Sequence, residues 1–544
     1  MSTRQRRRVT AAFVGLAATL TMTPVAGAAV ADRAGSAAPA ASTGASDQVN
    51  APVPALHWTR CYAGLPYLCA TPKAPLDYDD PTGPTVVLDL VKVPATDPKH
   101  RLGTIFVNPG GPGGSASGFA PDAATYLGKA VTARYDVIGI DPRGVGVHTP
   151  MVCRTDQPAP TPFTHPFPVT VKESGTAWRT AQWFRAACSN DPGRIVAHMS
   201  TADTARDMDL IRQAVGDRQL NYYGISYGTF LGTSYAAMFP SRVGRLVVDS
   251  VLDPVQWSTG TDRPPFLPFS TRIKSARGAD ESLTSAFVEC DRVGRGQCPF
   301  AGNAPAKWAK LAAKAKSTGL DIGMDTPMTY ADLIGGVVGN LYGHNYHSLA
   351  AALQAIYDAN VGGRVAKADL RAAGADLVKA HDSIAVAPYT SPLADGQRKV
   401  GDAFSGVACS DTRNPRTQDA WWNAGRMQDK DYPGFGSLWT WASATCGGWP
   451  GTTMDDSFLG PYDVKTANPV LVINNRYDPA TPIQGAQRVN RLLAGSRLLT
   501  TREHGHGALD NTCVGKQFTA YFLSGKLPAV GMVCPADAGL FATS

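Results

Sequence analysis

Short apolar segments alternate with amphipathic ones between about residue 85 and residue 250. Segments of this length that are rich in Val, Ile and Leu are typical of buried strands, and the stretch TARDMDLIRQAV has apolar residues at helical spacing. Strands that alternate with helices predict a mostly parallel sheet covered on both faces. The predicted strands are Val86 to Val93, Thr104 to Val107, Tyr135 to Ile140, Leu220 to Tyr223 and Arg245 to Val248, and the predicted helix is Thr204 to Val215.

The pattern changes after about Asp253. From there to about Gly451 the chain is rich in helix formers and tryptophan and offers no series of strands, and strand character returns at Val470 to Asn474 and at Arg497 to Thr501. We therefore expect one α/β core, residues 55–253 and 452–544, interrupted by a largely helical lid over residues 254–451. An independent middle domain is the alternative, and it would not alter the chemistry below.

The first residues are typical of a secretory signal. An arginine-rich start precedes the apolar run Ala11 to Met22 and the small-residue cleavage pattern Ala26-Gly27-Ala28. About twelve apolar residues are too few for a membrane span, which needs roughly 20. Residues 1–28 are therefore predicted to be a signal peptide, and residues 29–54, composed largely of Ala, Ser, Gly and Pro, a linker or pro-segment. The protein is expected to be secreted.

Composition and charge exclude several classes of protein. Of 544 residues, 44% are hydrophobic and 17% charged, which describes a globular chain without a later membrane-spanning stretch. Four arginines of the signal segment contribute to the net charge of +7, so the mature chain is close to neutral. The remainder has no basic patch with interleaved aromatics, which argues against nucleic acid as the main partner. The oligomeric state is left open.

Ten cysteines fall into local couples along the chain. An even number of cysteines behind a signal peptide favours disulfides, and the absence of a C-x-x-C couple weakens a zinc interpretation. Sequence alone leaves the connectivity open, and we predict sequential pairing. The expected pairs are Cys61 with Cys69, Cys153 with Cys188, Cys290 with Cys298, Cys409 with Cys446, and Cys513 with Cys534.

The central chemical motif is Gly224-Ile225-Ser226-Tyr227-Gly228. It lies between the strand-like LNYY and the helix-like TFLGTSYAAMF, and a strand, a sharp turn and a helix form the nucleophile elbow of α/β hydrolases. The glycines allow the strand and helix to approach closely, and the helix N-terminus favours developing negative charge. We therefore predict an α/β-hydrolase fold with Ser226 as the nucleophile. A lone G-x-S-x-G motif is weak evidence, so the assignment of Ser226 depends on whether the chain also offers a base and an acid for it.

A serine nucleophile needs a base, and the base needs a carboxylate that orients it. The order in this fold is serine, acid, histidine. Asp478 follows the strand that begins at Val470, and His506 follows the next strand between two glycines that let its ring approach the serine. We predict that Asp478 and His506 complete the triad at the carboxyl ends of their strands.

Two rivals remain open for these roles. Asp249 follows the strand RLVV, a position from which some hydrolases of this fold take their acid, and His504 lies two residues before His506. The pair His504-x-His506, or His344-x-x-His347, could instead bind a metal. Neither pair has a clear third ligand, so no metal or cofactor is predicted.

A glycine-rich loop supplies the last part of the site. The run from Asn108 to Gly114 follows the strand TIFV and exposes backbone N–H groups. It lacks the Gly-Lys-Ser/Thr ending of a phosphate-binding P-loop. We expect an oxyanion hole formed by the N–H groups of Gly111 and Tyr227.

The chain contains the motifs NPGGPGGSASG, YDVIGIDPRGVG, YYGISYGTFLG, VACSDT with CGGWP, and VLVINNRYDPATP with HGHG. Taken together, they resemble those of secreted bacterial tripeptidyl aminopeptidases, relatives of proline iminopeptidase among the α/β-hydrolase serine peptidases. The resemblance extends from about Trp58 to Cys534. It implies Ser226, Asp478 and His506 as the triad, a helical lid, and peptide substrates cleaved from a free amino terminus. The family also includes carboxylesterases, and an inactive binding protein on the same fold is a further alternative.

An enzyme that acts on free amino termini must hold an ammonium group. A buried ammonium needs carboxylate or carbonyl partners, because an unpaired charge taken out of water is costly. The predicted lid contains four acidic candidates that sequence does not rank, Glu281, Glu289, Asp402 and Asp411.

Overall fold

The computed structural model describes residues 49–189, 195–260, 267–384, 389–392, 398–450 and 457–542. The predicted signal peptide, residues 1–28, and residues 29–48 of the predicted linker lie outside the described residues.

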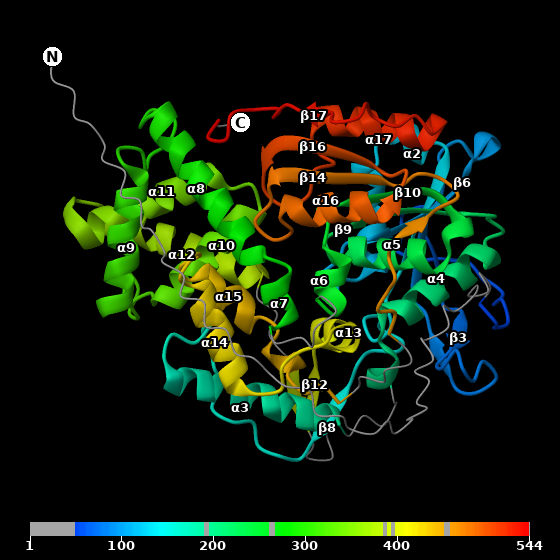
Figure 1. The fold of residues 1–544 in the computed structure, drawn as a ribbon, viewed down its shortest axis with the longest axis horizontal. Helices are drawn as coiled ribbons and strands as arrows, with labels where there is room; N and C mark the ends of the chain where they lie inside the picture. Colours follow the sequence, from blue (N-terminus) through cyan, green and yellow to red (C-terminus); the bar gives the residue numbers. More distant parts are fainter. Residues whose placement is uncertain are drawn as a thin grey trace, which may run out of the picture. The chain divides into compact units, whose positions relative to one another are not determined.

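A ten-stranded sheet forms the centre of the fold (Figure 1). Seven consecutive strands of this sheet run parallel to one another, and three further strands at one edge pair in the antiparallel sense. The prediction of a mostly parallel sheet is therefore confirmed. In spatial order the strands are β1 (Thr59–Arg60), β2 (Leu68–Ala70), β5 (Leu90–Val93), β7 (Tyr135–Ile140), β6 (Gly103–Asn108), β9 (Leu220–Ile225), β10 (Val243–Asp249), β14 (Leu471–Tyr477), β16 (Arg497–His504) and β17 (Val533–Cys534).

One predicted strand is wrong. The segment Val86 to Val93 divides into β4 (Thr85–Val87), which pairs with β3 (Lys73–Pro75) in a separate two-stranded sheet, and β5 of the large sheet. The chain changes sheets between two adjacent residues. The N–H of Leu88 donates to the carbonyl of Pro72, whereas the carbonyl of Asp89 accepts from Asp141. Alternating hydrophobicity predicts extended backbone, but it does not identify the strand's partner.

Helices cover both faces of the large sheet. Adjacent strand residues point to opposite faces, so that Tyr222 packs into one apolar core and Tyr223 into the other. Both faces are buried, which explains the nearly continuous apolar runs of the parallel strands. The first core takes residues from α4 (Thr201–Ala214), α5 (Tyr227–Met238) and α16 (Ile483–Leu492), and the second from α1 (Ala116–Tyr126), α2 (Lys129–Thr132) and α17 (Thr512–Ser524).

A series of helices is inserted between β10 and β14, and we call them the inserted helices. They build a third apolar core of their own, with fully buried residues such as Leu333, Leu353 and Trp421. Two short strands, β11 (Tyr389–Pro392) and β12 (Arg398–Gly401), lie among them. The inserted helices are α6 (Pro254–Ser258), α7 (Phe269–Arg272), α8 (Ser275–Val293), α9 (Ala304–Thr318), α10 (Tyr330–Tyr342), α11 (Tyr346–Tyr357), α12 (Lys367–Ile384), α13 (Ala403–Asp411), α14 (Gln418–Gln428) and α15 (Phe435–Trp441).

An earlier segment of the chain joins the inserted helices. Strand β8 (Cys153–Thr155) pairs with β12, and the Trp178 ring of α3 (Val171–Cys188) lies 5.4 Å from that of Trp421. The sequence analysis assigned this segment to the first part of the α/β core. Its amphipathic pattern indicates that α3 buries one face, but not which core receives that face.

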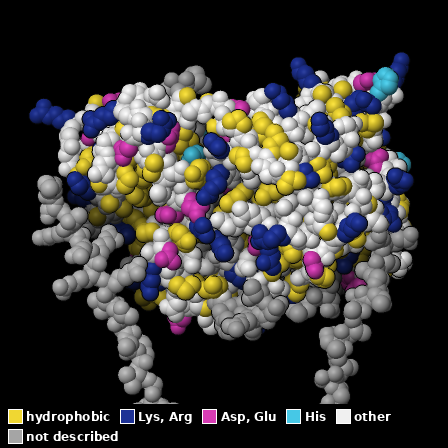
Figure 2. Space-filling model, turned by 45° about the horizontal axis from the view of Figure 1, so that its top comes forward, with side chains coloured by type: hydrophobic (Ala, Val, Ile, Leu, Met, Phe, Trp, Pro, Cys, Tyr) yellow, Lys and Arg dark blue, Asp and Glu magenta, His cyan; other side chains and the backbone are white. Residues whose placement is uncertain are grey.

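The cysteines form the five sequential disulfides that the sequence predicts, and none of the described cysteines is free. The bond Cys409–Cys446 constrains α13, and Cys513–Cys534 joins α17 to β17. Within the described ranges no helix is both long and apolar enough to cross a membrane. On the face drawn in Figure 2, lysine and arginine side chains are interspersed with apolar and uncharged ones.

The carboxyl-terminal tail connects the sheet to the inserted helices. After β17 the carboxylate of Asp537 accepts the N–H of Thr512, and its own N–H donates to Glu503. The tail then runs towards α8 (Figure 1), and Phe541 is buried in the core of the inserted helices beside Leu283 and Phe300. The last described residues therefore stabilise the contact between the two parts. The remaining short strands are β13 (Val464–Lys465) and β15 (Leu493–Ala494).

Candidate active site

Ser226 occupies the turn between β9 and α5 in a strained backbone conformation. Its φ of 59° and ψ of −125° lie where residues with a Cβ atom are rarely found, which is the sharp turn expected of a nucleophile elbow. The flanking glycines are required by close packing. A Cβ atom at Gly224 would lie 2.4 Å from the carbonyl oxygen of Gly228, and one at Gly228 would lie 2.7 Å from that of Asn108.

Asp478 and His506 lie against each other at the ends of β14 and β16. Nδ1 of His506 is 3.0 Å from Oδ2 and 3.1 Å from Oδ1 of Asp478, which is fully buried. Oδ1 also accepts the N–H groups of Ala480 and Thr481 at 2.9 and 2.8 Å. The carboxylate is therefore well bonded and orients the imidazole.

The two groups shift each other's pKa in opposite directions. Burial raises the pKa of Asp478, but the charge and hydrogen bond of His506 and the two N–H groups outweigh burial and lower it below its usual value. Burial lowers the pKa of His506, but the Asp478 carboxylate outweighs burial and raises it above the usual 6.5. The pair favours an ionised acid that stabilises a protonated imidazole.

The end of β10 brings the serine and the histidine loop to the same place. The N–H of Ser226 donates to the carbonyl of Asp249 at 3.1 Å. Immediately after His506, the N–H of Gly507 donates to Oγ of Ser250 at 2.8 Å and the N–H of Ala508 donates to the Asp249 carboxylate at 3.1 Å. Asp249, the last residue of β10, and Ser250, which follows it, therefore anchor both the elbow and the histidine loop.

The two rival residues have other partners. The Asp249 carboxylate accepts from Tyr223 and Ala508 rather than from His506, and burial raises its pKa to about 7. The His504 ring stacks on Tyr477 at 4.4 Å between ring centroids, its Nε2 lies 3.1 Å from Oγ of Ser285 in α8, and burial lowers its pKa to about 4. The described part of the chain holds no group of three or more His, Cys, Asp or Glu residues able to bind a metal ion.

The glycine-rich loop packs directly against the elbow. A Cβ atom at Gly110 would lie 2.8 Å from Cβ of Ser226 and 2.9 Å from the nitrogen of Tyr227, so no larger residue fits at Gly110. Gly110 and Gly111 have φ values of 91° and 107°, which favour glycine. The sequence analysis named Gly111 and did not identify Gly110 as the contact, because a run of glycines does not indicate which one faces the serine.

The inserted helices contact all three loops of the site. Ser275 of α8 donates to the carbonyl of Ala480 in the Asp478 loop. The ring centroid of Tyr342, at the end of α10, lies 5.0 Å from that of His506. The backbone carbonyl of Tyr342 accepts the N–H of His506 at 3.5 Å. A Cβ atom at Gly113 would lie 2.8 Å from the nitrogen of Phe404 in α13. Tyr342 is a site residue that the sequence analysis missed, since its helix gives no sign of its neighbour.

Each of the four acidic candidates already has a protein partner. Glu281 accepts from Arg277 and Arg476, and Glu289 is paired with Arg292. Asp402 accepts from Ser405, and Asp411 accepts from Thr201. Of these partners, Arg476 precedes Asp478 by two residues.

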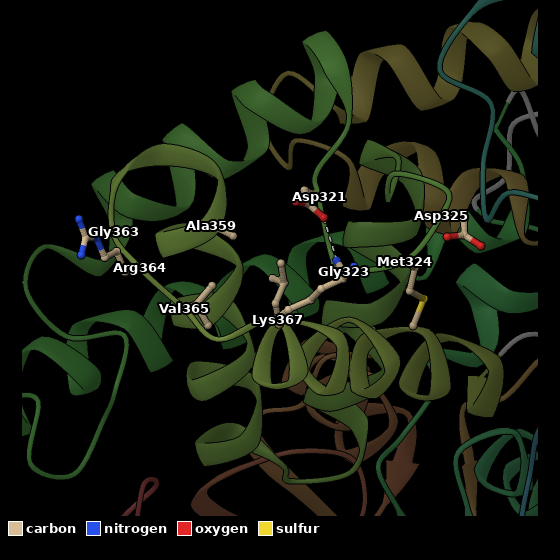
Figure 3. Close-up of a pocket in the computed structure, with 10 residues that line it drawn as sticks. Asp321, Gly323, Met324, Asp325, Ala359, Gly363, Arg364, Val365 and Lys367 are labelled. Carbon is tan, nitrogen blue, oxygen red and sulfur yellow. Dashed lines mark hydrogen bonds between the residues drawn. The ribbon is translucent and has the colours of Figure 1, made fainter.

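A cavity of about 710 Å³ lies elsewhere, on the inserted helices (Figure 3). Asp321, Asp325, Arg364 and Lys367 contribute to its lining, and none of the predicted site residues does. The cavity is therefore separate from the serine–histidine–aspartate site.

Comparisons with known proteins agree with the α/β-hydrolase fold. A family model described as alpha/beta hydrolase fold matches residues 103–275, and one described as TAP-like protein matches residues 432–534. The chain is 31% identical over 503 residues to a tripeptidyl aminopeptidase of Streptomyces lividans, covering 89% of this chain and 87% of that protein. It is 29% identical over 511 residues to the serine protease Hip1 of Mycobacterium tuberculosis, with coverage of 88% and 91%. It is 30% identical over 487 residues to carboxylesterase B of the same species, with coverage of 86% for both.

Proposed function

Because the chain belongs to the tripeptidyl aminopeptidase family of α/β hydrolases and is a serine peptidase, we propose that Ser226, His506 and Asp478 form its catalytic triad and that it cleaves peptides from the free amino terminus. The main observation in support of the triad is the contact between Asp478 and His506. The end of β10 bonds to the histidine loop and to the strained turn at Ser226, and so brings the two together. No cofactor enters the proposed reaction.

The proposed reaction has two steps. Oγ of Ser226 attacks the scissile carbonyl carbon while Nε2 of His506 takes the hydroxyl proton, and the imidazolium then gives that proton to the leaving amine as the peptide C–N bond breaks. Water hydrolyses the resulting ester by the same route and restores the serine. Asp478 accepts the Nδ1 proton of His506 in a hydrogen bond throughout, which fixes the tautomer and stabilises the imidazolium.

The negative charge of each tetrahedral intermediate needs donors. We propose the N–H groups of Gly111 and Tyr227 for this role, supported by the contact of the neighbouring Gly110 with the nitrogen of Tyr227. Tyr227 is the first residue of α5, so its N–H is also at the positive end of a helix dipole. Each such donor typically contributes about 10²–10³ in kcat.

The proposed roles predict a pH dependence. His506 acts as a base only when neutral, so kcat/KM should fall about tenfold per pH unit below its pKa. Because Asp478 raises that pKa, the midpoint should lie above 6.5. In Asp478→Asn the charge of Asp478 is gone while burial remains, and Asp249 is left as the acidic group that raises the pKa of His506, so the midpoint of the residual activity should move to lower pH than in the wild type. Rates measured across the pH range would contradict the assignment if the variant kept the wild-type midpoint.

The inserted helices support an exopeptidase. They contact the loops of Asp478, His506 and Gly113, so they lie close enough to the proposed site to limit the length of the peptide that binds there. Enzymes that count residues from a chain end need such a block and a site for the terminal ammonium. We therefore propose that the helices over residues 254–451 act as a lid and that the substrate is a peptide with a free α-amino group.

The free-amine requirement can be tested with one pair of substrates. Acetylation of a tripeptide anilide removes the positive charge and leaves the enzyme's ammonium partner unpaired, so kcat/KM should fall roughly 10²-fold or more. The control is a pair of the corresponding esters, which report acylation without an amide bond. Equal rates for the free and acetylated anilides would refute the exopeptidase.

An esterase is the second candidate function, because one relative of comparable identity is named a carboxylesterase. An esterase should hydrolyse acetylated esters well and free tripeptide anilides slowly, which is the reverse of the peptidase pattern. Secretion is also proposed, supported by the five disulfides. Amino-terminal sequencing of the exported protein would locate the cleavage after the predicted signal peptide.

A further inference from the structure

A buried chain of hydrogen bonds connects the elbow to the inserted helix α13. The carboxylate of Asp411, at the end of α13, accepts the N–H of Thr201 at 2.7 Å and its hydroxyl at 2.6 Å. The same Thr201 hydroxyl contacts the hydroxyl of Tyr227. All three side chains are buried, with Asp411 3% and Tyr227 0% exposed.

The direction of this chain follows from its donors. When Asp411 is ionised, the single hydrogen of the Thr201 hydroxyl is donated to its carboxylate, so the Tyr227 hydroxyl is the donor towards Thr201. Tyr227 therefore donates to Thr201, and Thr201 donates to Asp411. Such chains polarise their members and fix their geometry. In effect, a carboxylate from α13 holds the ring of the residue that follows the nucleophile.

The other end of α13 meets the glycine-rich loop. Phe404 is its second residue, and its nitrogen lies within 2.8 Å of where a Cβ atom at Gly113 would be. The disulfide Cys409–Cys446 and the packing of Gly406 against Met199 limit movement of the helix between its ends. One nine-residue helix thus contacts the loop of one proposed oxyanion donor and is connected through Thr201 to the side chain of the other.

We propose that α13 positions the oxyanion hole, and that Asp411 is a positioning residue that acts on the N–H of Tyr227 through Thr201. This inference rests on the proposed function, in which Tyr227 is an oxyanion donor. Asp411 touches no reacting atom. Its effect is to hold the Tyr227 ring, and with it the first turn of α5, in the orientation that the tetrahedral intermediate requires, so its loss should affect the transition state more than the bound substrate.

Helix α5 offers a matched pair of variants. Tyr227→Phe removes the hydroxyl that donates to Thr201 and keeps the Tyr227 N–H. Tyr235→Phe, two turns further along, removes an equally buried hydroxyl that donates to Asp209 at 2.9 Å. Each change removes one buried tyrosine hydrogen bond between α5 and α4. Only the hydroxyl of Tyr227 belongs to the hydrogen-bond chain that leads to α13.

Asp411→Asn tests the other end of the hydrogen-bond chain. The asparagine NH₂ group cannot accept a hydrogen bond, so one of the two Thr201 donors, the N–H or the hydroxyl, loses its acceptor. Tyr227→Phe and Asp411→Asn should each lower kcat about tenfold or more and leave KM within about threefold, since one oxyanion donor is worth about 10²–10³ and is here displaced rather than removed. The Ki of a tripeptide aldehyde, which forms a tetrahedral adduct, should rise in parallel, and that of the product tripeptide should not. Tyr235→Phe should leave kcat and both Ki values unchanged.

Rescue separates positioning from stability. Thr201→Ser keeps the hydroxyl and should retain kcat, whereas Thr201→Val should behave like Asp411→Asn, so the inference remains testable if Asp411→Asn does not fold. The inference is overturned if Tyr227→Phe matches Tyr235→Phe, or if the product and aldehyde Ki values rise together. Fluorophosphonate labelling of Ser226 in the same wild-type preparation tests the proposed function separately. Absence of that label refutes the function, whereas labelled enzyme with unaffected variants refutes only the positioning.

Discussion

Replacing Ser226 with alanine should lower kcat by about 10³-fold or more, because the loss of the proposed nucleophile leaves only binding and oxyanion stabilisation. Fluorophosphonate should label a single peptide of the wild-type protein, the one that contains Ser226, and should leave the alanine variant unlabelled. This prediction follows from the strained elbow, in which the φ of 59° at Ser226 is maintained by close packing against Gly110 and between Gly224 and Gly228. Labelling at another serine, or an active alanine variant, would contradict the assignment.

The strain itself provides the control. Ser226→Gly should be as inactive as Ser226→Ala, but glycine adopts a positive φ without a Cβ penalty, so it should be about 1 kcal/mol more stable than the alanine variant. Thermal unfolding of the two inactive proteins measures this difference. A glycine variant that unfolds before the alanine variant would show that the elbow stores no strain.

The second large effect concerns the acid and the base. His506→Ala should lower kcat about 10³-fold or more and Asp478→Asn about 10⁴-fold, because the amide supports the wrong imidazole tautomer. The matched controls are His504→Ala and Asp249→Asn. His504 bonds to Ser285 and stacks on Tyr477, away from Asp478, so its loss should cost much less in kcat.

Asp249→Asn is informative because its carboxyl has a pKa of about 7 and its partners are an N–H and a tyrosine hydroxyl. Asparagine keeps one acceptor oxygen in a side chain of the same shape, so kcat should fall less than tenfold relative to the wild type. Kinetics of the four variants decide the assignment. A larger loss in His504→Ala than in His506→Ala, or in Asp249→Asn than in Asp478→Asn, would exchange the roles.

Sequence predicted well the features that depend on local pattern. Six of the strands in the parallel sheet overlap predicted segments, and the glycines around Ser226 form the turn that their spacing indicates. The five disulfides join cysteines in sequential pairs, because each pair lies in neighbouring elements. These features require only that nearby residues fold against each other.

What sequence could not predict depends on contacts between distant segments. Helix α3 packs with the inserted helices because the Trp178 side chain meets Trp421, far away in the chain. Tyr342 reaches His506, and Asp411 reaches Thr201, across similar separations. Asp411 is the clearest example. Its sequence position suggested an ammonium partner, whereas its carboxylate is bonded to two donors of one threonine.

The carboxyl-terminal tail has a consequence for the order in which the molecule is completed. During synthesis, Ser226 emerges from the ribosome long before Asp478 and His506. Phe541, which packs into the core of the inserted helices, emerges later still. Before residues 471–506 have been synthesised, β14 and β16 are missing from the sheet and the elbow has no histidine beside it. A growing chain therefore contains the proposed nucleophile Ser226 without the proposed acid and base, and it should be inactive at least until His506 has been synthesised and folded.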